Sequence, residues 1–295
     1  MWATLWTLYL KIVYLLFEMT FYRYMGSHGF ETLHDGRFKM ASVLELNDPF
    51  EGLGCCVGAL SEQAVKNDVK HGYLESWGLT QQKDDKGAFE EFWNAMDSET
   101  KQVYRALTSS KIREGVANRT LVKSMYVLCF SMCEDGDPAQ KLMWSHYANG
   151  YRGVRIGIRM DDPHFPLYAD SVKYCWERPR LDLAKVMSLH DEDKEVVRFW
   201  RDNLITKSNE WAYERECRIV ADALSLEKDR DCKGGEAYFW RFDPSVVANV
   251  DLGFLIPEAA VRAIVDVVKA KYPTALVRKV VLNKEDYGIS YREVV

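Results

Sequence analysis

The sequence contains no internal repeat, no low-complexity run and no linker rich in proline, glycine or serine. Without such a boundary, we expect a single domain over residues 1–295. The two glycine-rich phosphate-binding motifs, GxGxxG and GxxxxGK[ST], are also missing, which argues against a Rossmann or P-loop enzyme. There is no long run of lysine or arginine, and the net charge is −5. Electrostatics alone therefore does not hold this chain on nucleic acid.

Cysteine and histidine show no regular metal-binding pattern. The seven cysteines are irregularly spaced, and an odd number suits reduced thiols better than a disulfide framework. Cys129 and Cys133 are four positions apart, but no second cysteine or histidine pair completes a zinc set. We therefore expect no metal ion and a cytoplasmic location.

The first 19 residues are strongly apolar, but Lys11 and Glu18 interrupt them. A membrane-spanning helix needs about 20 predominantly apolar residues. The basic region and small-residue cleavage site of a signal peptide are not obvious. We expect a buried or interfacial helix over residues 1–19, without stable membrane insertion, and a membrane anchor is the alternative.

The rest of the chain alternates between patterns typical of strands and of helices. Strand patterns occupy residues 21–26, 37–42, 124–132, 153–160, 167–176, 214–224, 236–242, 275–283 and 288–294. Helical patterns occupy residues 30–35, 139–148, 181–207 and 257–272, and residues 60–117 read as a helical insert. Gly234-Gly235 predicts a hairpin between residues 214–224 and 236–242. Because there is no strict βαβ rhythm, we predict an α+β fold with a mixed, mainly antiparallel sheet over residues 20–295.

One segment, "WAYERECRIV" at residues 211–220, is unusual for a strand. In an extended chain Glu214, Glu216 and Arg218 would point to the same face. Two carboxylates and a guanidinium side by side are either a solvated stripe with a weak ion pair or a polar cluster that performs chemistry.

Four stretches concentrate polar and aromatic residues: Tyr22-Arg23-Tyr24, Asn47 to Glu51, Trp144 to Tyr147, and Trp211 to Arg218. Their motifs, "FYRYM", "LNDPFE", "LCFS" with "LMWSHYANGYRGVRIGI", and "NEWAYERECRIV", resemble in this order a bacterial family catalogued as a domain of unknown function. The resemblance covers residues 20 to at least 243. Tyr151 is a departure, because members often carry histidine there.

The chain also resembles, more remotely, ADP-ribosyltransferases of the R-S-E type. The matching residues are Arg23 on the first strand, Ser131 at the end of a middle strand, and Glu214-x-Glu216. The resemblance implies an ADP-ribosyltransferase-like fold and NAD as substrate. Glu216 would stabilise an oxocarbenium-like state, as in glycoside cleavage, and Glu214 would orient the acceptor.

The other residues of the expected site have supporting roles. Arg23 would bind a phosphate, Ser131 would support Glu216, and Arg218 would keep a carboxylate ionised. Tyr24 or Trp144 would stack on nicotinamide, and Tyr147 would also contact NAD. Further pocket candidates are Asn47, Asp48, Glu51 and His146. Each has a structural alternative: a turn at 47–49, a core stripe for Trp144 and Tyr147, and a hydrogen-bonded structural histidine.

Three functions therefore remain open. The first is an NAD-consuming transferase, acting as a toxin or phage-defence effector, whose acceptor is a protein, a nucleic acid or water. The second is a metal-dependent nuclease that uses Asp48, Glu214, Glu216 and Lys207. The third is a non-enzymatic module that binds a nucleotide or a partner protein. Loss of activity on chelation separates the second from the first, and NAD binding without turnover identifies the third.

Overall fold

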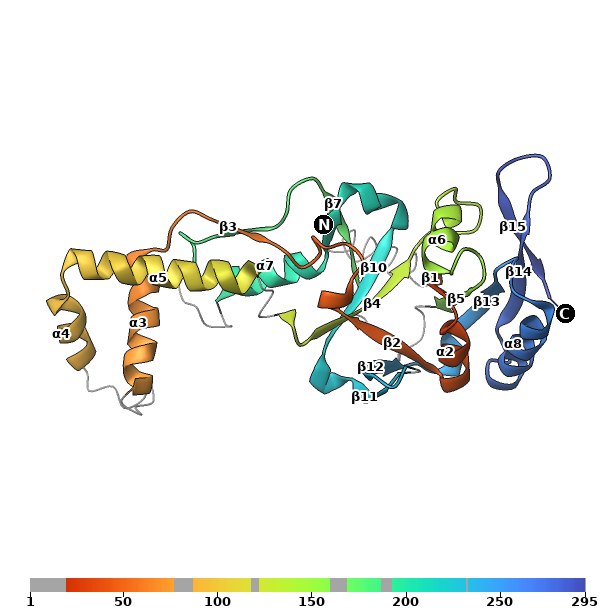
Figure 1. Cartoon of the computed structure of the whole chain (residues 1–295), viewed down its shortest axis with the longest axis horizontal. Helices are drawn as coiled ribbons and strands as arrows, with labels where there is room; N and C mark the ends of the chain where they lie inside the picture. Colours follow the sequence, from red (N-terminus) through yellow and green to blue (C-terminus); the bar gives the residue numbers. More distant parts are fainter. Residues whose placement is uncertain are drawn as a thin grey trace, which may run out of the picture. The chain divides into compact units, whose positions relative to one another are not determined.

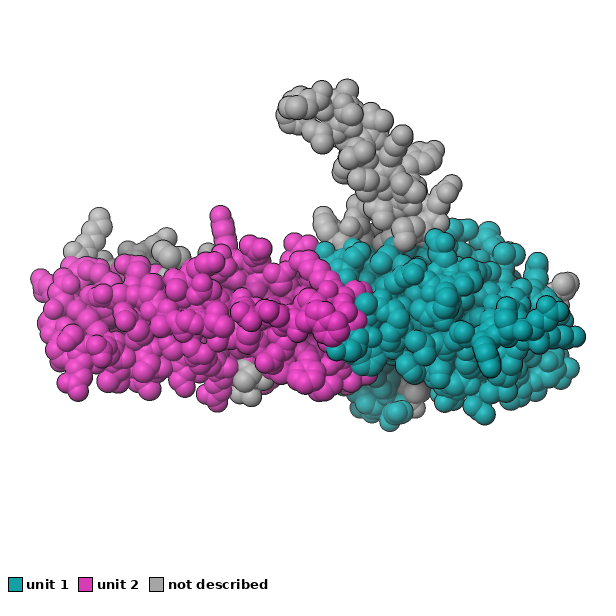
Figure 2. Space-filling model, turned by 90° about the horizontal axis from the view of Figure 1, so that it is seen from above, with its two compact units in different colours: residues 1–42, 125–172, 210–295 teal, residues 43–124, 173–209 magenta. Residues whose placement is uncertain are grey.

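A computed structural model describes residues 20–76, 87–117, 122–159, 169–186, 193–231 and 233–294 (Figure 1). The expected N-terminal helix over residues 1–19 lies outside these residues. The chain divides into two compact units, coloured separately in Figure 2. Unit 1 comprises residues 1–42, 125–172 and 210–295, and unit 2 comprises residues 43–124 and 173–209. A single domain over residues 1–295 stays a prediction.

Unit 1 is built on one large sheet, which the described residues form from eleven strands. Nine of them follow the order β11-β12-β2-β4-β1-β5-β13-β14-β15, while β10 pairs with β4 and β6. Their bounds are β1 Thr20–Met25, β2 Arg37–Ser42, β4 Met125–Ser131, β5 Val154–Arg159, β6 Ala169–Ser171, β10 Glu216–Asp222, β11 Glu227–Arg230, β12 Glu236–Arg241, β13 Val247–Leu252, β14 Leu276–Leu282 and β15 Ile289–Glu293. Only β13 and β14 pair in parallel within this sheet of described strands, so the prediction of an α+β fold with a mainly antiparallel sheet is confirmed.

The two faces of this sheet differ in chemistry. One face carries the largest apolar cluster, in which Phe21, Ile156 and Val250 contact helices α2 (Gly29–Asp35) and α8 (Glu258–Lys271). The opposite face carries an aromatic cluster that includes Tyr22 and Tyr24, and this cluster packs against helix α6 (Gln140–Tyr147). Alternation along β1 explains the division, because successive strand residues point to opposite faces.

The predictions for three segments of secondary structure were wrong. Residues 167–176 form two short strands, β6 and β7 (Lys173–Cys175), which belong to different units. The long helix over residues 181–207 is only α7 (Lys194–Leu204), because Asp193 accepts hydrogen bonds from two backbone N–H groups at its start and β9 (Thr206–Ser208) follows. The expected hairpin is formed by β11 and β12, and β10 pairs elsewhere.

Unit 2 is mainly helical. Its helices are α3 (Glu62–Ser76), α4 (Ala88–Ala95), α5 (Ser98–Ala117) and α7, so helices occupy most of the described part of residues 60–117. An apolar cluster with Phe89, Trp93 and Phe199 holds them together. Two parallel strand pairs complete the unit, β3 (Cys55–Val57) with β8 (Arg180–Asp182) and β7 with β9.

Candidate functional site

Three neighbouring strands of unit 1 bring two of the expected R-S-E residues, Ser131 and Glu216, to one row of the sheet. Ser131 is the cross-strand partner of Tyr22 on β1 and of Glu216 on β10. Direct partners in antiparallel strands point to the same face. Arg23 follows Tyr22 and is the direct partner of Ile156 on β5, so its side chain starts from the opposite face, which carries the apolar cluster of Phe21 and Ile156. Tyr22 and Glu216 are far apart in the sequence, yet both pair with Ser131 on β4.

The expected strand at residues 211–220 begins later than the sequence suggested. Asn209–Glu214 form a 3₁₀ turn, and β10 begins at Glu216. Arg215 lies between them and has φ +44°. This is the left-handed region, which residues other than glycine rarely adopt. The prediction that Glu214 shares a strand face with Glu216 and Arg218 is therefore wrong, because the chain turns at Arg215 and Glu214 is not part of the strand.

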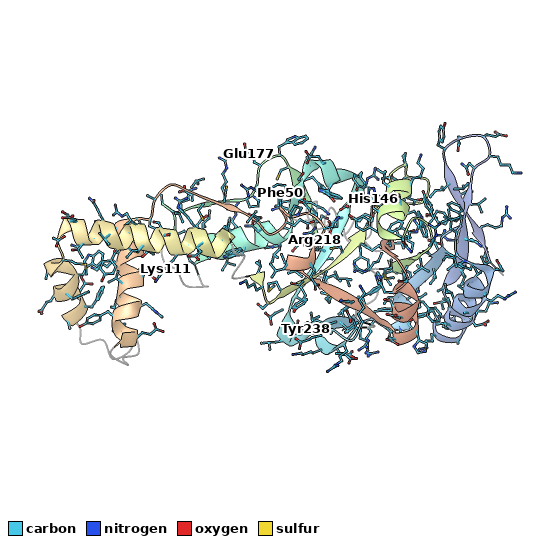
Figure 3. All side chains as sticks on the ribbon, viewed as in Figure 1. Phe50, Lys111, His146, Glu177, Arg218 and Tyr238 are labelled. Atoms are coloured by element: carbon cyan, nitrogen blue, oxygen red, sulfur yellow. The ribbon has the colours of Figure 1, made fainter. Side chains whose placement is uncertain are left out.

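Glu216 and Arg218 form a buried ion pair. Arg218 Nε donates to Glu216 Oε1 at 2.7 Å, and Nη2 donates to Oε2 at 2.9 Å. Glu216 is 5% exposed and Arg218 1% exposed, and Arg218 lies near the centre of Figure 3. Burial, reinforced by the charge of Glu216, raises the pKa of the neighbouring Cys129, so Cys129 remains a neutral thiol beside the carboxylate. This arrangement keeps Glu216 in one orientation, with both oxygens engaged.

Glu214 has a different environment. Its carboxylate accepts a short hydrogen bond from the Tyr147 hydroxyl on α6, and its backbone carbonyl accepts one from Ser131 Oγ at 2.6 Å. The expected support of Glu216 by Ser131 is thus replaced by support of the Glu214 backbone. His146, on the same helix, shares a 3.0 Å hydrogen bond with the hydroxyl of Tyr213 in the 3₁₀ turn, which fits its structural interpretation.

Arg23 lies beside β4, at the point where β4 is paired with neither β1 nor β2 among the described residues. β4 pairs with β1 at Ser131 and with β2 at residues 126 and 127. Between these points, Arg23 Nη1 donates to the Cys129 carbonyl at 2.7 Å. Burial lowers the pKa of Arg23, although the negative charge of Glu216 opposes this effect. The buried Arg23 Nε has no acceptor among the residues that the structure describes, which leaves one donor for an anionic or carbonyl oxygen.

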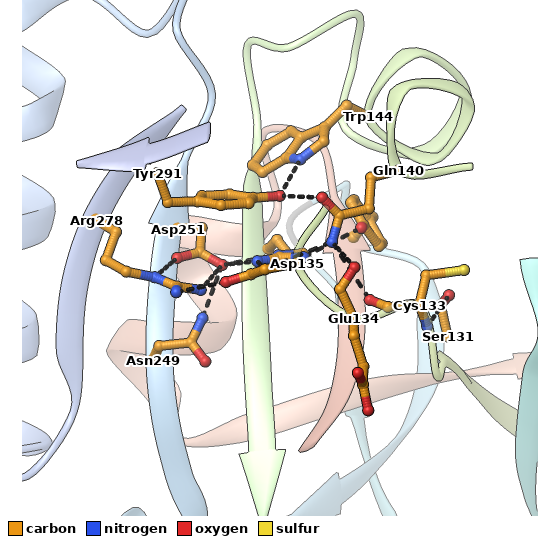
Figure 4. A network of polar contacts seen from close by, with 12 residues as sticks. Ser131, Cys133, Glu134, Asp135, Gln140, Trp144, Asn249, Asp251, Arg278 and Tyr291 are labelled. Carbon is orange, nitrogen blue, oxygen red and sulfur yellow. Dashed lines mark hydrogen bonds and ion pairs between the residues drawn. The ribbon is translucent and has the colours of Figure 1, made fainter. Parts of the chain in front are cut away.

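The two expected nicotinamide-stacking rings contact each other. Tyr24 and Trp144 meet edge to face with ring centroids 5.4 Å apart, and both are buried. The Trp144 indole N–H donates to the Tyr291 hydroxyl at 3.0 Å, and that hydroxyl donates to Gln140 (Figure 4). These contacts favour the core interpretation of the Trp144 side chain.

A charged network beneath these rings was not anticipated from the sequence. Arg155 on β5 is fully buried and pairs with Asp251 on β13 and Asp135 in the loop after β4, each at 2.6 Å. Arg278 on β14 pairs with the same two aspartates at 2.6 and 2.7 Å (Figure 4). The Tyr22 ring lies 4.0 Å from the Arg155 guanidinium. The network fixes the loop that follows Ser131.

The Asn47 to Glu51 candidates belong to unit 2 and form a turn there. Asp48 Oδ1 accepts from the backbone N–H of Phe50 at 2.9 Å, as an aspartate does when it stabilises a turn. Glu51 and Lys207, both buried, form an ion pair at 3.2 Å. Asn47 precedes this turn. Within the described ranges, no group of three or more His, Cys, Asp or Glu side chains could hold a metal ion.

The comparisons with known proteins agree in part with the sequence motifs. Residues 143–219 match a family model described as "Protein of unknown function (DUF2971)". This stretch contains Trp144, His146, Tyr147, Glu214, Glu216 and Arg218, so α6 and the start of β10 are similar to that family. No curated protein matches the chain, and no solved structure matches it. In the described residues, no helix is both long and apolar enough to cross a membrane.

The buried network had a detectable signal in the sequence. Arg155 lies between Val154 and Ile156, and Asp251 lies between Val250 and Leu252. Charged residues are almost never fully buried unless they are paired. The partners of such a pair are 96 positions apart, which is why the pairing itself could not be read from spacing. Arg215 gave no signal, because its role depends on its backbone conformation.

Proposed function

We propose that this chain is an ADP-ribosyltransferase-like enzyme that consumes NAD. The main support is the row Tyr22–Ser131–Glu216 across β1, β4 and β10. Arg23 starts from the opposite face of β1, and its guanidinium reaches the Cys129 carbonyl on β4. The donor on Arg23 Nε that lacks a protein acceptor among the described residues fits a phosphate oxygen of NAD. A cytoplasmic toxin or antiviral-defence effector is the cellular role that this chemistry suggests.

In the proposed reaction, the bond between C1′ of the ribose and the nicotinamide nitrogen breaks, and the bonding electrons leave with neutral nicotinamide. Positive charge then develops at C1′ and the ring oxygen. Glu216 accepts a hydrogen bond from the ribose 2′-hydroxyl and stabilises this charge. An ionised carboxylate offers about four acceptor positions, and Arg218 donates to one position on each oxygen of Glu216.

The second half of the reaction assigns a separate role to Glu214. The acceptor nucleophile forms a bond to C1′, and its proton passes to the Glu214 carboxylate. Tyr147 orients this carboxylate by donating to it. The two glutamates therefore act on different reactants, the ribose and the acceptor, although they are only two residues apart.

The test compares wild type with Glu216→Gln in nicotinamide release from NAD. Glutamine keeps the size of the side chain but removes its charge, so we expect release to fall by about 10²-fold or more. Glu236→Gln is the matched control, since this exposed glutamate pairs with Lys228 on the neighbouring β11, and its rate should equal wild type.

The fold of each variant is checked by circular dichroism and thermal melting. A folded Glu216→Gln protein that releases nicotinamide at the wild-type rate would contradict the proposal. Wild type that binds NAD in calorimetry without releasing nicotinamide would instead identify a nucleotide-binding module.

A further inference from the structure

Arg215 is the residue between the two glutamates, and its backbone has φ +44°. A residue with a Cβ remains in the left-handed region only where its surroundings hold it there, and such residues gather at functional sites. We propose that Arg215 is a positioning residue that keeps Glu214 and Glu216 in their separate environments. This inference rests on the ADP-ribosyl transfer proposed above.

The loop after β4 holds Arg215 by its backbone and by its side chain. The backbone N–H of Met132 donates to the Arg215 carbonyl at 2.9 Å. The Arg215 guanidinium pairs with Asp137 at 2.6 Å, and the Asp137 side chain is only 9% exposed. Asp137 also accepts from the backbone N–H of Ala139 at 2.8 Å, so its carboxylate is fixed at the start of α6.

The loop is itself anchored to the sheet. Asp135, two residues before Asp137, pairs with Arg155 at 2.6 Å and with Arg278 at 2.7 Å. Gln140 donates to the Glu134 carbonyl at 2.5 Å. Arg215 is therefore connected through Asp137 to a segment that the buried network already holds, which supplies the constraint that its backbone conformation requires.

The turn at Arg215 determines where each carboxylate goes. With an extended residue at 215, Glu214 and Glu216 would point to the same face and compete for the same partners. With the observed conformation, Glu214 reaches Tyr147 and Glu216 reaches Arg218. Glu216 is also held by β10, whose pairing with β4 starts at this residue. Loss of the ion pair between Arg215 and Asp137 should thus disturb Glu214 more than Glu216.

This difference predicts a change in the fate of ADP-ribose. NAD with a label on its adenine is incubated with the full chain and total cell lysate, and both nicotinamide release and macromolecule-bound label are measured. For Arg215→Ala and Asp137→Asn we expect label transfer to fall by about 10-fold or more, because a small misplacement of a reacting group costs that much. Nicotinamide release should change less than about 3-fold, since Glu216 keeps Arg218. The KM for NAD should stay at the wild-type value.

Two further variants separate this role from a general effect on structure. Arg215→Lys keeps a charge that can pair with Asp137, so its ratio of transfer to release should remain near wild type. Arg241→Ala is the matched control, because Arg241 is 58% exposed, as Arg215 is, and pairs with Glu227 at 2.9 Å on β12. Its ratio should not change.

The outcomes distinguish this inference from the proposed function. If wild type transfers label and Arg215→Ala and Asp137→Asn keep the wild-type ratio, the role of Arg215 is refuted while the transferase proposal stands. If wild type releases no nicotinamide, or releases it without transferring label, both the division of roles and the role of Arg215 are refuted. Should Arg215→Ala fail to fold, Asp137→Asn and Arg215→Lys decide the question.

Discussion

At the scale of single residues, two kinds of buried charge occur in unit 1. Glu216 and Arg218 form a bidentate pair, whereas Arg155 belongs to a network with two aspartates and a second arginine. Removing one partner of a buried pair leaves an uncompensated charge, which costs far more than the pair itself contributes. The consequences of mutation therefore depend on burial more than on the number of ion pairs.

Asp251 gives the clearest test of this point. It is fully buried and accepts hydrogen bonds from Arg155, Arg278 and Asn249. We expect Asp251→Asn to lower the free energy of unfolding by about 3–5 kcal/mol, because Arg155 would lose a charged partner inside the fold. Urea denaturation followed by circular dichroism measures the change.

The matched control is Glu227→Gln, which removes the same charge at the surface. Glu227 is 39% exposed and pairs with Arg37 and Arg241. Exposed pairs contribute less than about 1 kcal/mol. An effect of Asp251→Asn no larger than that of Glu227→Gln would show that the network does not stabilise the fold.

The sequence could predict which residue types form the candidate site but not how they are oriented. Tyr22, Ser131 and Glu216 could be assigned to strands from alternation, but their pairing in one row could not be predicted from the sequence. The assignment of Glu214 to the same strand face was wrong because a left-handed residue at 215 leaves no mark in the pattern of side chains. Arginine at that position gives no hint of it, since glycine, asparagine and aspartate are the residues that usually signal such a turn.

At the scale of elements, helices and strands in unit 1 follow local signals well. Gly36 ends α2 with φ +68°, and Asn149-Gly150 follow α6 with positive φ, as expected for left-handed residues after a helix. The segment over residues 181–207 was harder, because several charged residues precede α7 in the sequence and Lys207 follows its end at Leu204. Tertiary pairing of β9 with β7 overrides this pattern.

The junction between α6 and β5 depends on close backbone approach at Gly153. A Cβ added there would lie 1.9 Å from the Met25 carbonyl oxygen and 3.0 Å from that of Ala148. The Met25 backbone cannot move without disturbing β1, the strand of Tyr22 and Arg23. We therefore expect Gly153→Ala to lower the free energy of unfolding by at least about 1–3 kcal/mol, the usual cost of overpacking.

Thermal or urea denaturation measures this loss, and Gly26→Ala is the control. A Cβ at Gly26, next to Met25, would have its nearest neighbour at 3.5 Å, an ordinary contact distance. Equal stability of the two variants would mean that β1 and β5 can separate at little cost.

At the scale of the whole molecule, the fold class was accessible from sequence because it depends on the order of elements. The division into two units was not, since unit 2 combines residues 43–124 with residues 173–209 and no linker marks either boundary. The strand order was equally hidden: β10 lies beside β4, although residues 132–215 separate the paired residues Ser131 and Glu216 in the sequence. Long-range pairing of this kind has no local signature.

Carboxylates with lowered pKa values occur mainly in unit 1, at Asp135, Asp229, Asp231, Glu236 and Asp286. For Asp135, burial alone would raise the pKa, but the charges and hydrogen bonds of Arg155 and Arg278 lower it below 3.8. A carboxyl group whose pKa is lower in the folded than in the unfolded state stabilises the fold above the unfolded value. This stabilisation is lost as the pH falls through the folded value.

The free energy of unfolding should therefore decrease as the pH falls below about 4, where the unfolded state binds more protons than the folded state. Asp135→Asn isolates one contribution: it should be less stable than wild type at pH 7, and the difference should shrink as the pH falls below about 4 and Asp135 of the wild type is protonated. Urea denaturation of both proteins at several pH values measures this difference. A difference that stays constant down to pH 2 would mean that Asp135 contributes through packing, and that its charge does not hold the loop against Arg155 and Arg278.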